Sequence, residues 1–480
     1  MAASYILQTM NQSKTVVVAP LLPIKSPASF RDPSGTVYFT ENHVLRTIQP
    51  VYAEHWDFAE KSRFFAEAIR QGKLLPFTET SPLEESWKTL EIERLPFISY
   101  PYEWSFGQLK DAALLTLDLM KLAMKHGLVL KDASAYNVQF YNGKPVFIDH
   151  LSFEVRRIKE PWTAYLQFCK HFLAPLALMC YLDIRCGKML SLWVEGLPLD
   201  MVSSLLPWKT RFSPLLQLHI HTHARMQQHH ADARLAADKV KQISLNESAV
   251  PKLCESLRMA IENMQLPAFS TQWGNYYCDT NYSREGAEEK SRLVRQVAAS
   301  CPGALSVDLG ANTGLYSRIL AEYFRTVIAS DMDYLAVEKM AASLKQEGNS
   351  TILPLVLDLS NPSPGIGWAS EERESFQNRC KADLISALAL IHHLVQGAGI
   401  PLGKVACYFA SLLRQGGTLI LEFVPWEDSQ VQRLMAARQN VFTDYTLDGC
   451  IGAFQEEGFI LQKQFSLTDS LRTLLVFTRT

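Results

Sequence analysis

The chain has 480 residues, which is more than one core normally contains, because single domains cluster near roughly 100–150 residues. Hydrophobic residues make up 48% of the chain and charged residues 20%, as in folded, soluble proteins. Lys and Arg (47) nearly balance Asp and Glu (49), so the net charge of −2 provides no field that attracts nucleic acid or an anionic membrane. These values predict two or more folded domains and exclude a general nucleic-acid-coating role.

Cysteine usage and the start of the chain indicate a cytoplasmic protein. The nine cysteines are scattered and include no C-x-x-C pair, so we expect reduced thiols and neither a zinc site nor a redox dithiol. The first ten residues lack the basic stretch and apolar core of a secretory signal. The longest apolar run, residues 172–182, is shorter than the ~20 residues that cross a bilayer, so we expect a buried helix and no membrane span.

The N-terminal half mixes strands and helices. Residues 1–29 contain prolines without a sustained apolar period and predict an irregular arm. Apolar spacing then predicts, in chain order, a hairpin over 36–40 and 44–48, a helix over 58–70, an extended stretch over 95–100 and a helix over 108–126. Since the chain is largely helical beyond residue 160, we expect an α+β domain over 30–245, followed by a linker and helical connection over 246–282.

The C-terminal part has a different pattern of apolar residues. Apolar runs alternate with helical segments, at 304–309, 326–330, 352–357, 382–390 and 417–424. This alternation is typical of βαβ units in a parallel sheet. The last two runs, 459–467 and 471–478, are joined by so short a turn that they must pair antiparallel. The sequence therefore predicts an α/β domain over 283–480, whose mostly parallel sheet ends in an antiparallel hairpin.

One segment of this domain predicts a ligand site. ALSVDLGANTGLY (304–316) reads as a strand that runs into a glycine turn and then a helix. Gly310 and Gly314 allow a ligand to approach the backbone, and the helix offers free N–H groups. Asp331 ends the next apolar run, where a carboxylate can accept hydrogen bonds from both hydroxyls of a ribose. Together these residues indicate a nucleotide-like ligand.

These residues resemble the class I S-adenosylmethionine (SAM) dependent methyltransferases, and the resemblance covers residues 283–480. VDLGANTG (307–314) is similar to the first SAM-binding motif of that family, with Asn312 where many members have Gly; Asn tolerates left-handed dihedral angles. LDL (357–359), DLISALALIHH (383–393) and QGGTLILE (415–422) are placed like its adenine-flanking segment, fourth strand and fifth strand. The resemblance implies a Rossmann-like, seven-stranded sheet and SAM as cofactor.

The resemblance also implies roles for single residues. The glycine turn with Asp308 would hold the amino-acid end of SAM, the acid after the second strand its ribose, and the LDL segment its adenine. The expected cofactor-binding residues are Asp308, Gly310, Asn312, Gly314, Asp331, Asp358 and Leu359. No metal is needed for this chemistry. A nicotinamide dehydrogenase is the competing interpretation, but its G-x-G-x-x-G fingerprint is absent, since position 315 is Leu.

His392 and His393 are the candidate catalytic residues. They follow the fourth strand, at the edge where open α/β sheets bind ligands. Either imidazole could deprotonate an acceptor hydroxyl, because imidazole titrates near neutral pH. The alternative is that one ring packs and the other only lines the pocket. Glu422 and Trp426, at the end of the fifth strand, either line the acceptor pocket or pack in the structure.

The N-terminal half contains a second pattern. Asp132 is followed by Asn137 and, after a hairpin turning at 142–143, by Asp149. Kinases place a catalytic Asp, a metal-binding Asn and a metal-binding Asp in this order. Residues 31–242 therefore weakly resemble the protein-kinase-like and aminoglycoside-phosphotransferase-like folds, which implies ATP at these three residues.

The departures from the kinase pattern keep two alternatives open. Arg46 stands where the phosphate-binding Lys would be, with Glu60 on the partner helix, and Arg does not simply replace a compact Lys charge. Asp149-His-Leu also differs from the D-F-G motif. The alternatives are a kinase-like fold without phosphotransfer and a turn held by Asx hydrogen bonds.

A histidine cluster and an aromatic segment have two interpretations each. The five clustered histidines are His219, His221, His223, His229 and His230. Alternating imidazoles on a strand would suit zinc or nickel, but the flanks are helical in pattern and favour a solvated helix face. The aromatic segment (273–277), with Tyr282 and Lys290, either covers the SAM pocket or packs at the domain junction.

The sequence as a whole predicts a SAM-dependent methyltransferase whose N-terminal domain recognises a substrate or partner. YPYEW (100–104) and LKDASAYN (130–137) give the whole chain a resemblance to large bacterial methyltransferases described as nodulation-related. The methyl acceptor is unidentified, with a small molecule favoured. Two alternatives stay open: a regulatory protein that binds SAM or S-adenosylhomocysteine (SAH), and a bifunctional phosphotransferase and methyltransferase.

Overall fold

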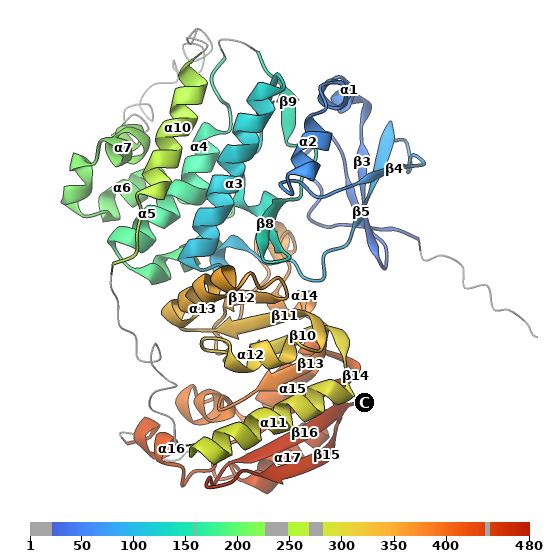
Figure 1. Ribbon diagram of the computed structural model, residues 1–480, viewed down its shortest axis with the longest axis vertical. Coiled ribbons are helices and arrows are strands. Elements are labelled where there is room, and N and C mark those ends of the chain that lie inside the picture. Colours follow the sequence, from blue (N-terminus) through green and yellow to red (C-terminus); the bar gives the residue numbers. More distant parts are fainter. Residues whose placement is uncertain (1–21, 158–159, 226–247, 268–281, 437–441) are drawn as a thin grey trace, which may run out of the picture.

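The computed structural model describes residues 22–157, 160–225, 248–267, 282–436 and 442–480. Most of the expected arm, His229, His230 and the aromatic segment at 273–277 lie outside these residues. An N-terminal part (22–267) stands above a C-terminal part (282–480) in Figure 1. The limits of the domains within the chain stay a prediction.

An antiparallel sheet begins the N-terminal part. Its strands, in spatial order, are β1 (Ile24–Lys25), β2 (Val37–Phe39), β3 (His43–Ile48), β5 (Lys88–Glu93) and β4 (Thr78–Thr80). The hairpin expected over 36–48 is present as β2 and β3.

The single helix expected over 58–70 is wrong. Two helices, α1 (Ala53–Lys61) and α2 (Phe64–Arg70), are separated by Arg63, whose φ of 63° is left-handed and interrupts the helix. In α1, Trp56 is fully buried, whereas Phe58 is 39% exposed.

A helical bundle forms the rest of the N-terminal part. Its long helix α3 (Phe106–Lys125) begins at Ser105, whose hydroxyl caps the first turn together with Gln108. The other helices are α4 (Tyr165–Phe168), α5 (Ala174–Tyr181), α6 (Leu199–Leu205), α7 (Pro214–Leu216) and α10 (Ala249–Glu262). Two small antiparallel pairs join β6 (Leu128–Leu130) to β9 (Phe153–Val155) and β7 (Val138–Tyr141) to β8 (Lys144–Phe147).

The apolar run 172–182 was expected to form a buried helix. It contains α5, which the bundle buries almost completely. Among the residues that the structure describes, no helix has both the length and the apolar character needed to span a bilayer.

The C-terminal part is built on a seven-stranded sheet, which confirms the predicted fold class. Its strands, in spatial order, are β12 (Ile352–Val356), β11 (Phe324–Asp331), β10 (Gly303–Leu309), β13 (Ala382–Ala387), β14 (Leu413–Phe423), β16 (Thr473–Arg479) and β15 (Phe459–Ser466). The first five are parallel, and β16 is antiparallel to both of its neighbours.

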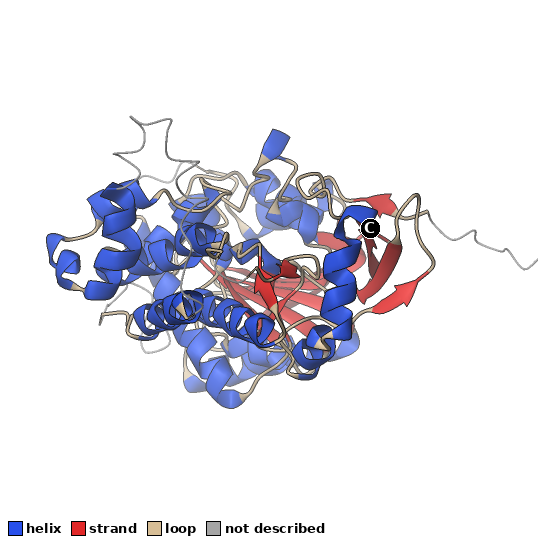
Figure 2. Cartoon of the chain, turned by 90° about the horizontal axis from the view of Figure 1, so that it is seen from above, coloured by secondary structure: helices blue, strands red, loops and turns tan. Residues whose placement is uncertain are grey.

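Helices precede or follow the strands along the chain and surround the sheet (Figure 2). They are α11 (Arg284–Ser300), α12 (Leu315–Leu320), α13 (Tyr334–Glu347), α14 (Phe376–Arg379), α15 (Leu402–Leu412), α16 (Ser429–Leu434) and α17 (Leu447–Glu456). The chain winds from β10 outward to β12 and then crosses to β13 on the other side. The carboxyl ends of β10 and β13 therefore form the switch point at which such sheets bind ligands.

Candidate functional site

The glycine turn lies at this switch point. Gly310, Asn312 and Gly314 have φ values of 74°, 50° and 82°, so all three are left-handed. The N–H of Gly310 donates to the carbonyl oxygen of Ser330 at 2.8 Å, which ties the turn to the end of β11. A Cβ atom on Gly314 would lie 2.7 Å from the Met340 sulfur, so no larger residue fits unless that side chain shifts. The N–H groups of residues 310–314 all donate to acceptors within the chain, which fixes the shape of the turn.

Two carboxylates, one half-buried and one buried, flank the turn. Asp331 Oδ2 accepts from the N–H of Asn312 and Oδ1 from the N–H of Asp333, both at 2.8 Å. Each oxygen keeps a further lone pair that a ribose hydroxyl can use. Asp308, only 2% exposed, accepts from the Ser317 hydroxyl at 2.6 Å. Burial raises the pKa of both Asp331 and Asp308 to about 6.

The predicted adenine segment lies at the same edge of the sheet. The N–H of Leu357 donates to the Asp331 carbonyl oxygen at 2.9 Å, which brings the end of β12 beside the end of β11. Asp358 Oδ1 accepts from the N–H and the hydroxyl of Ser360 at 2.8 and 2.6 Å. Asp358 and Leu359 are half-buried. All the predicted cofactor residues therefore lie along the carboxyl ends of β10, β11 and β12.

His392 and His393 lie on the other side of the switch point. They begin the π-helical turn η10 (His393–Gly397), and their ring centroids are 4.1 Å apart. His392 is 2% exposed, and its Nδ1 atom has no hydrogen-bond partner among the described residues. Burial lowers the pKa of His393 to about 4 and that of His392 well below its ordinary value. Both rings are thus neutral at pH 7 and are weak bases.

Sequence reasoning missed a buried ion pair next to these histidines. Lys290 Nζ lies 2.6 Å from Glu422 Oε2, and both side chains are almost fully buried. The same oxygen accepts from the N–H of Ala389, whose φ of 49° is left-handed, at 2.8 Å. Burial raises the pKa of Glu422 to about 7 and lowers that of Lys290. The pair thus joins α11, β14 and the turn that leads to the histidines.

A second buried pair extends this network. Arg472 contacts Asp428 through Nε–Oδ2 at 2.8 Å and Nη2–Oδ1 at 3.3 Å. The Tyr282 hydroxyl donates to Glu422 and accepts from Lys290 at 3.2 Å and Arg472 at 3.0 Å. The sequence contains one signal of this network: Lys290 occupies the apolar stripe of α11, where a charge requires a partner.

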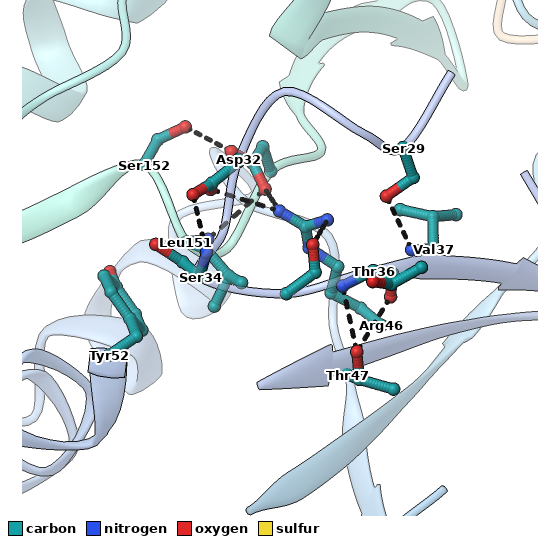
Figure 3. A network of polar contacts seen from close by, with 12 residues as sticks. Ser29, Asp32, Ser34, Thr36, Val37, Arg46, Thr47, Tyr52, Leu151 and Ser152 are labelled. Atoms are coloured by element: carbon teal, nitrogen blue, oxygen red, sulfur yellow. Dashed lines mark hydrogen bonds and ion pairs between the residues drawn. The ribbon is translucent and has the colours of Figure 1, made fainter. Parts of the chain in front are cut away.

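The kinase-like pattern of the N-terminal part corresponds to a cluster of polar contacts around Arg46, which Figure 3 shows. Arg46 Nη2 lies 3.2 Å from Asp149 Oδ1 and 3.6 Å from Asp32 Oδ2. Lys131 Nζ donates to the Ser34 hydroxyl at 3.1 Å. Glu60, expected as the partner of Arg46, instead lies 3.3 Å from Lys88. The cation at the kinase Lys position is therefore paired with carboxylates.

The three residues expected to bind ATP are each engaged within the chain. Asp132 accepts from the side chain of Gln167 at 2.8 Å, and burial raises its pKa. The Ser152 hydroxyl links the other two, because it accepts from Asn137 at 3.3 Å and donates to Asp149 at 2.6 Å. Burial acts to raise the pKa of Asp149, but Arg46 and Ser152 outweigh it and lower that pKa. Nucleotide binding here stays a prediction.

The solvated helix face predicted for the histidine cluster is wrong for His219 and His221. His219 and His221 lie in the helical turn η7 (Gln217–His221) but are 0% and 2% exposed. The partners of their ring nitrogens are Tyr165 and Ser256 for His219 and Ser203 and Thr210 for His221. The bundle thus buries two polar rings by satisfying both nitrogens of each. Within the described ranges, no group of three His, Cys, Asp or Glu side chains could hold a metal ion.

Comparison with known proteins gives a family for this chain. No protein-family model matches it. The nodulation protein NoeA from Rhizobium meliloti (strain 1021) is 33% identical over 483 residues, an alignment that covers 98% of this chain and 99% of that protein. The chain belongs to the NoeA family.

Solved structures match a smaller share of this NoeA-family chain. The magnesium protoporphyrin IX methyltransferase ChlM from Synechocystis PCC 6803, with bound SAM, is 20% identical with a TM-score of 0.31, over 43% of this chain and 89% of that chain. The N-methyltransferase NodS from Bradyrhizobium japonicum WM9, in complex with SAH, is 12% identical with a TM-score of 0.31, over 44% of this chain and 99% of that chain.

Proposed function

We propose that this member of the NoeA family is a SAM-dependent methyltransferase that acts on a small molecule. The observation that carries the proposal is the left-handed turn at 310–314, whose backbone is tied to the carboxylate of Asp331 at the switch point of the sheet. Such a turn places the start of the following helix beside the ligand, and the acid next to it offers acceptors to a ribose. This combination suits the amino-acid and ribose ends of SAM.

The chain's own residues bind and align the reactants. Asp308 and the turn containing Gly310, Asn312 and Gly314 hold the amino-acid end of SAM; Asp331 holds the ribose; Asp358 and the Leu359 backbone hold the adenine. SAM supplies a methyl group on a positively charged sulfur, so the reaction depends mainly on an in-line placement of the acceptor. The Gly310 side of the switch point then carries the cofactor, and the side with His392 and His393 carries the acceptor.

The acceptor has to lose a proton as its methyl bond forms. An electron pair of the acceptor attacks the methyl carbon, the carbon–sulfur bond breaks, and the proton passes to the neutral imidazole of His392 or His393. Neutral rings favour this step because an imidazolium has no free lone pair. Burial of both rings keeps them neutral across the physiological pH range.

Calorimetric titration with SAH tests the cofactor site. We expect saturable binding by the wild-type protein and by Asp200→Ala, an exposed control on α6. Asp331→Ala and Asp331→Asn should bind at least about tenfold more weakly, because each loses charged acceptors for the ribose hydroxyls. A folded wild-type protein that binds no SAH would reject the proposal.

Turnover separates an enzyme from a regulatory protein. We expect SAH to form from SAM when the protein receives a small-molecule fraction of cell extract, and His392→Ala/His393→Ala to reduce that rate without loss of SAH binding. Saturable binding without SAH formation in any fraction would favour the regulatory alternative.

A further inference from the structure

The segment that follows β12 is fastened to the N-terminal part. It begins at Asp358, in the proposed adenine site, and ends with α14. Glu372, only 3% exposed, receives two hydrogen bonds from Arg31 at 2.7 and 2.9 Å. Further along, Arg379 Nη2 lies 2.5 Å from Glu103 Oε1, and both side chains are almost fully buried. The segment that leaves the proposed adenine site is therefore held against the N-terminal part.

Two short helices of the N-terminal part lie at the same edge of the sheet. The 3-10 helix η2 (Pro101–Glu103) packs against β12, and the 3-10 helix η5 (Ile184–Ser191) packs against both η2 and α13. Tyr334, the first residue of α13, is half-buried there, and its pKa is raised first by burial and then by the carboxylate of Asp358. η2 and η5 thus lie beside the place proposed for the adenosine end of the cofactor.

η5 carries a cation without a partner at this place. Lys188 is half-buried, and among the described residues its ammonium forms no hydrogen bond and no ion pair. Its Nζ atom lies 5.7 Å from the ring centroid of Tyr102, whose hydroxyl is buried and also lacks a partner. Burial lowers the pKa of Lys188, while Glu103 and Asp358 are close enough to act in the opposite direction. Buried polar groups are nearly always hydrogen-bonded, so the Tyr102 hydroxyl indicates a ligand here, and the half-buried Lys188 ammonium beside it is accessible to the same ligand.

We propose that the N-terminal part completes the cofactor pocket and that Lys188 is a SAM-binding residue, donating to a ring nitrogen of the adenine opposite Asp358. This inference rests on the proposed function. Adenine presents a donor, its exocyclic amine, next to ring nitrogens that only accept. A carboxylate on one side and an ammonium on the other match that pattern. Tyr102 supports the ammonium through the face of its ring.

Lys188→Met tests this inference, because Met keeps the apolar stem and removes the donor. We expect the variant to bind SAH about tenfold more weakly or worse in calorimetry. Lys209→Met, on an exposed lysine of the same part, is the matched control and should bind as the wild type does. Thermal unfolding of each variant without ligand establishes that it is folded.

Analogues of SAH identify the contact. The 1-deaza, 3-deaza and 7-deaza analogues each lack one accepting ring nitrogen of adenine. Loss of the nitrogen that Lys188 contacts should weaken binding to the wild-type protein but not to Lys188→Met. Equal affinity of wild type and Lys188→Met for SAH overturns the inference and leaves the proposed function intact. The inference is also overturned if each deaza analogue loses as much affinity relative to SAH in Lys188→Met as it does in the wild type. Absence of SAH binding by the wild type instead rejects the proposed function itself.

Discussion

Lys290 and Glu422 form a buried ion pair beside the proposed acceptor site. Removal of one partner of a buried pair is costly, so Lys290→Met should destabilise the protein by about 3 kcal/mol, although Arg472 still lies 3.8 Å from Glu422. The double variant Lys290→Met/Glu422→Gln should recover part of this loss, because it leaves no unpaired charge in that pair. Urea unfolding measures both changes. Arg284→Met, which removes the exposed pair with Glu288, is the control and should change stability little. A small effect of Lys290→Met would contradict the importance of the pair.

Titration of Asp331 should make the affinity for the cofactor depend on pH. Its pKa is raised by burial to about 6, so the carboxylate that accepts the ribose hydroxyls becomes protonated as the pH falls through that value. SAH affinity should therefore be constant above pH 7 and about tenfold lower at pH 5. Calorimetry at several pH values gives the profile. Asp308 titrates in the same range, so Asp331→Asn decides the assignment: its weaker binding should vary much less with pH.

At the scale of elements, the glycine turn depends on backbone conformation. Gly314 has a φ of 82°, and an added Cβ would crowd Met340, so Gly314→Ala should cost more than the roughly 1–2 kcal/mol of a left-handed residue. It should also weaken SAH binding. Gly403→Ala, in α15 with open space around the Cβ, should be neutral or slightly stabilising. Urea unfolding and SAH titration of the two variants check both points; equal effects would show that the turn has no special requirement.

The elements also show how far sequence reasoning reaches. The C-terminal strands were predictable because a sheet covered on both faces requires apolar runs, and the glycine turn because positive φ favours Gly and Asn. The break at Arg63 was not, since nothing in its residue type favours the left-handed region. The burial of His219 was also missed, because its partners Tyr165 and Ser256 are distant in sequence. The same holds for Arg472 and its partner Asp428, which are 44 residues apart in the sequence.

At the scale of the molecule, the two parts share one hydrophobic core, in which Phe97 and Tyr100 of the N-terminal part join Phe376 of the C-terminal part. Arg379 crosses this contact, pairing with Glu103 and lying 4.2 Å from the ring centroid of Tyr100. Ligand binding at the C-terminal sheet should therefore stabilise the N-terminal bundle as well, since anything that binds only the folded state shifts the unfolding of whatever unfolds with it.

Arg379→Met should uncouple the two parts. Glu103 is left buried without its main partner, at a cost of about 3–5 kcal/mol, and the contact between the parts weakens. In the wild type, we expect SAH to slow amide hydrogen exchange both in β10 and in α3. In Arg379→Met, the protection should remain in β10 and be lost in α3. Lys345→Met, which removes an exposed pair with Asp111 across the same contact, should keep the wild-type pattern. Protection of α3 that survives in Arg379→Met would mean that the apolar core alone transmits the coupling.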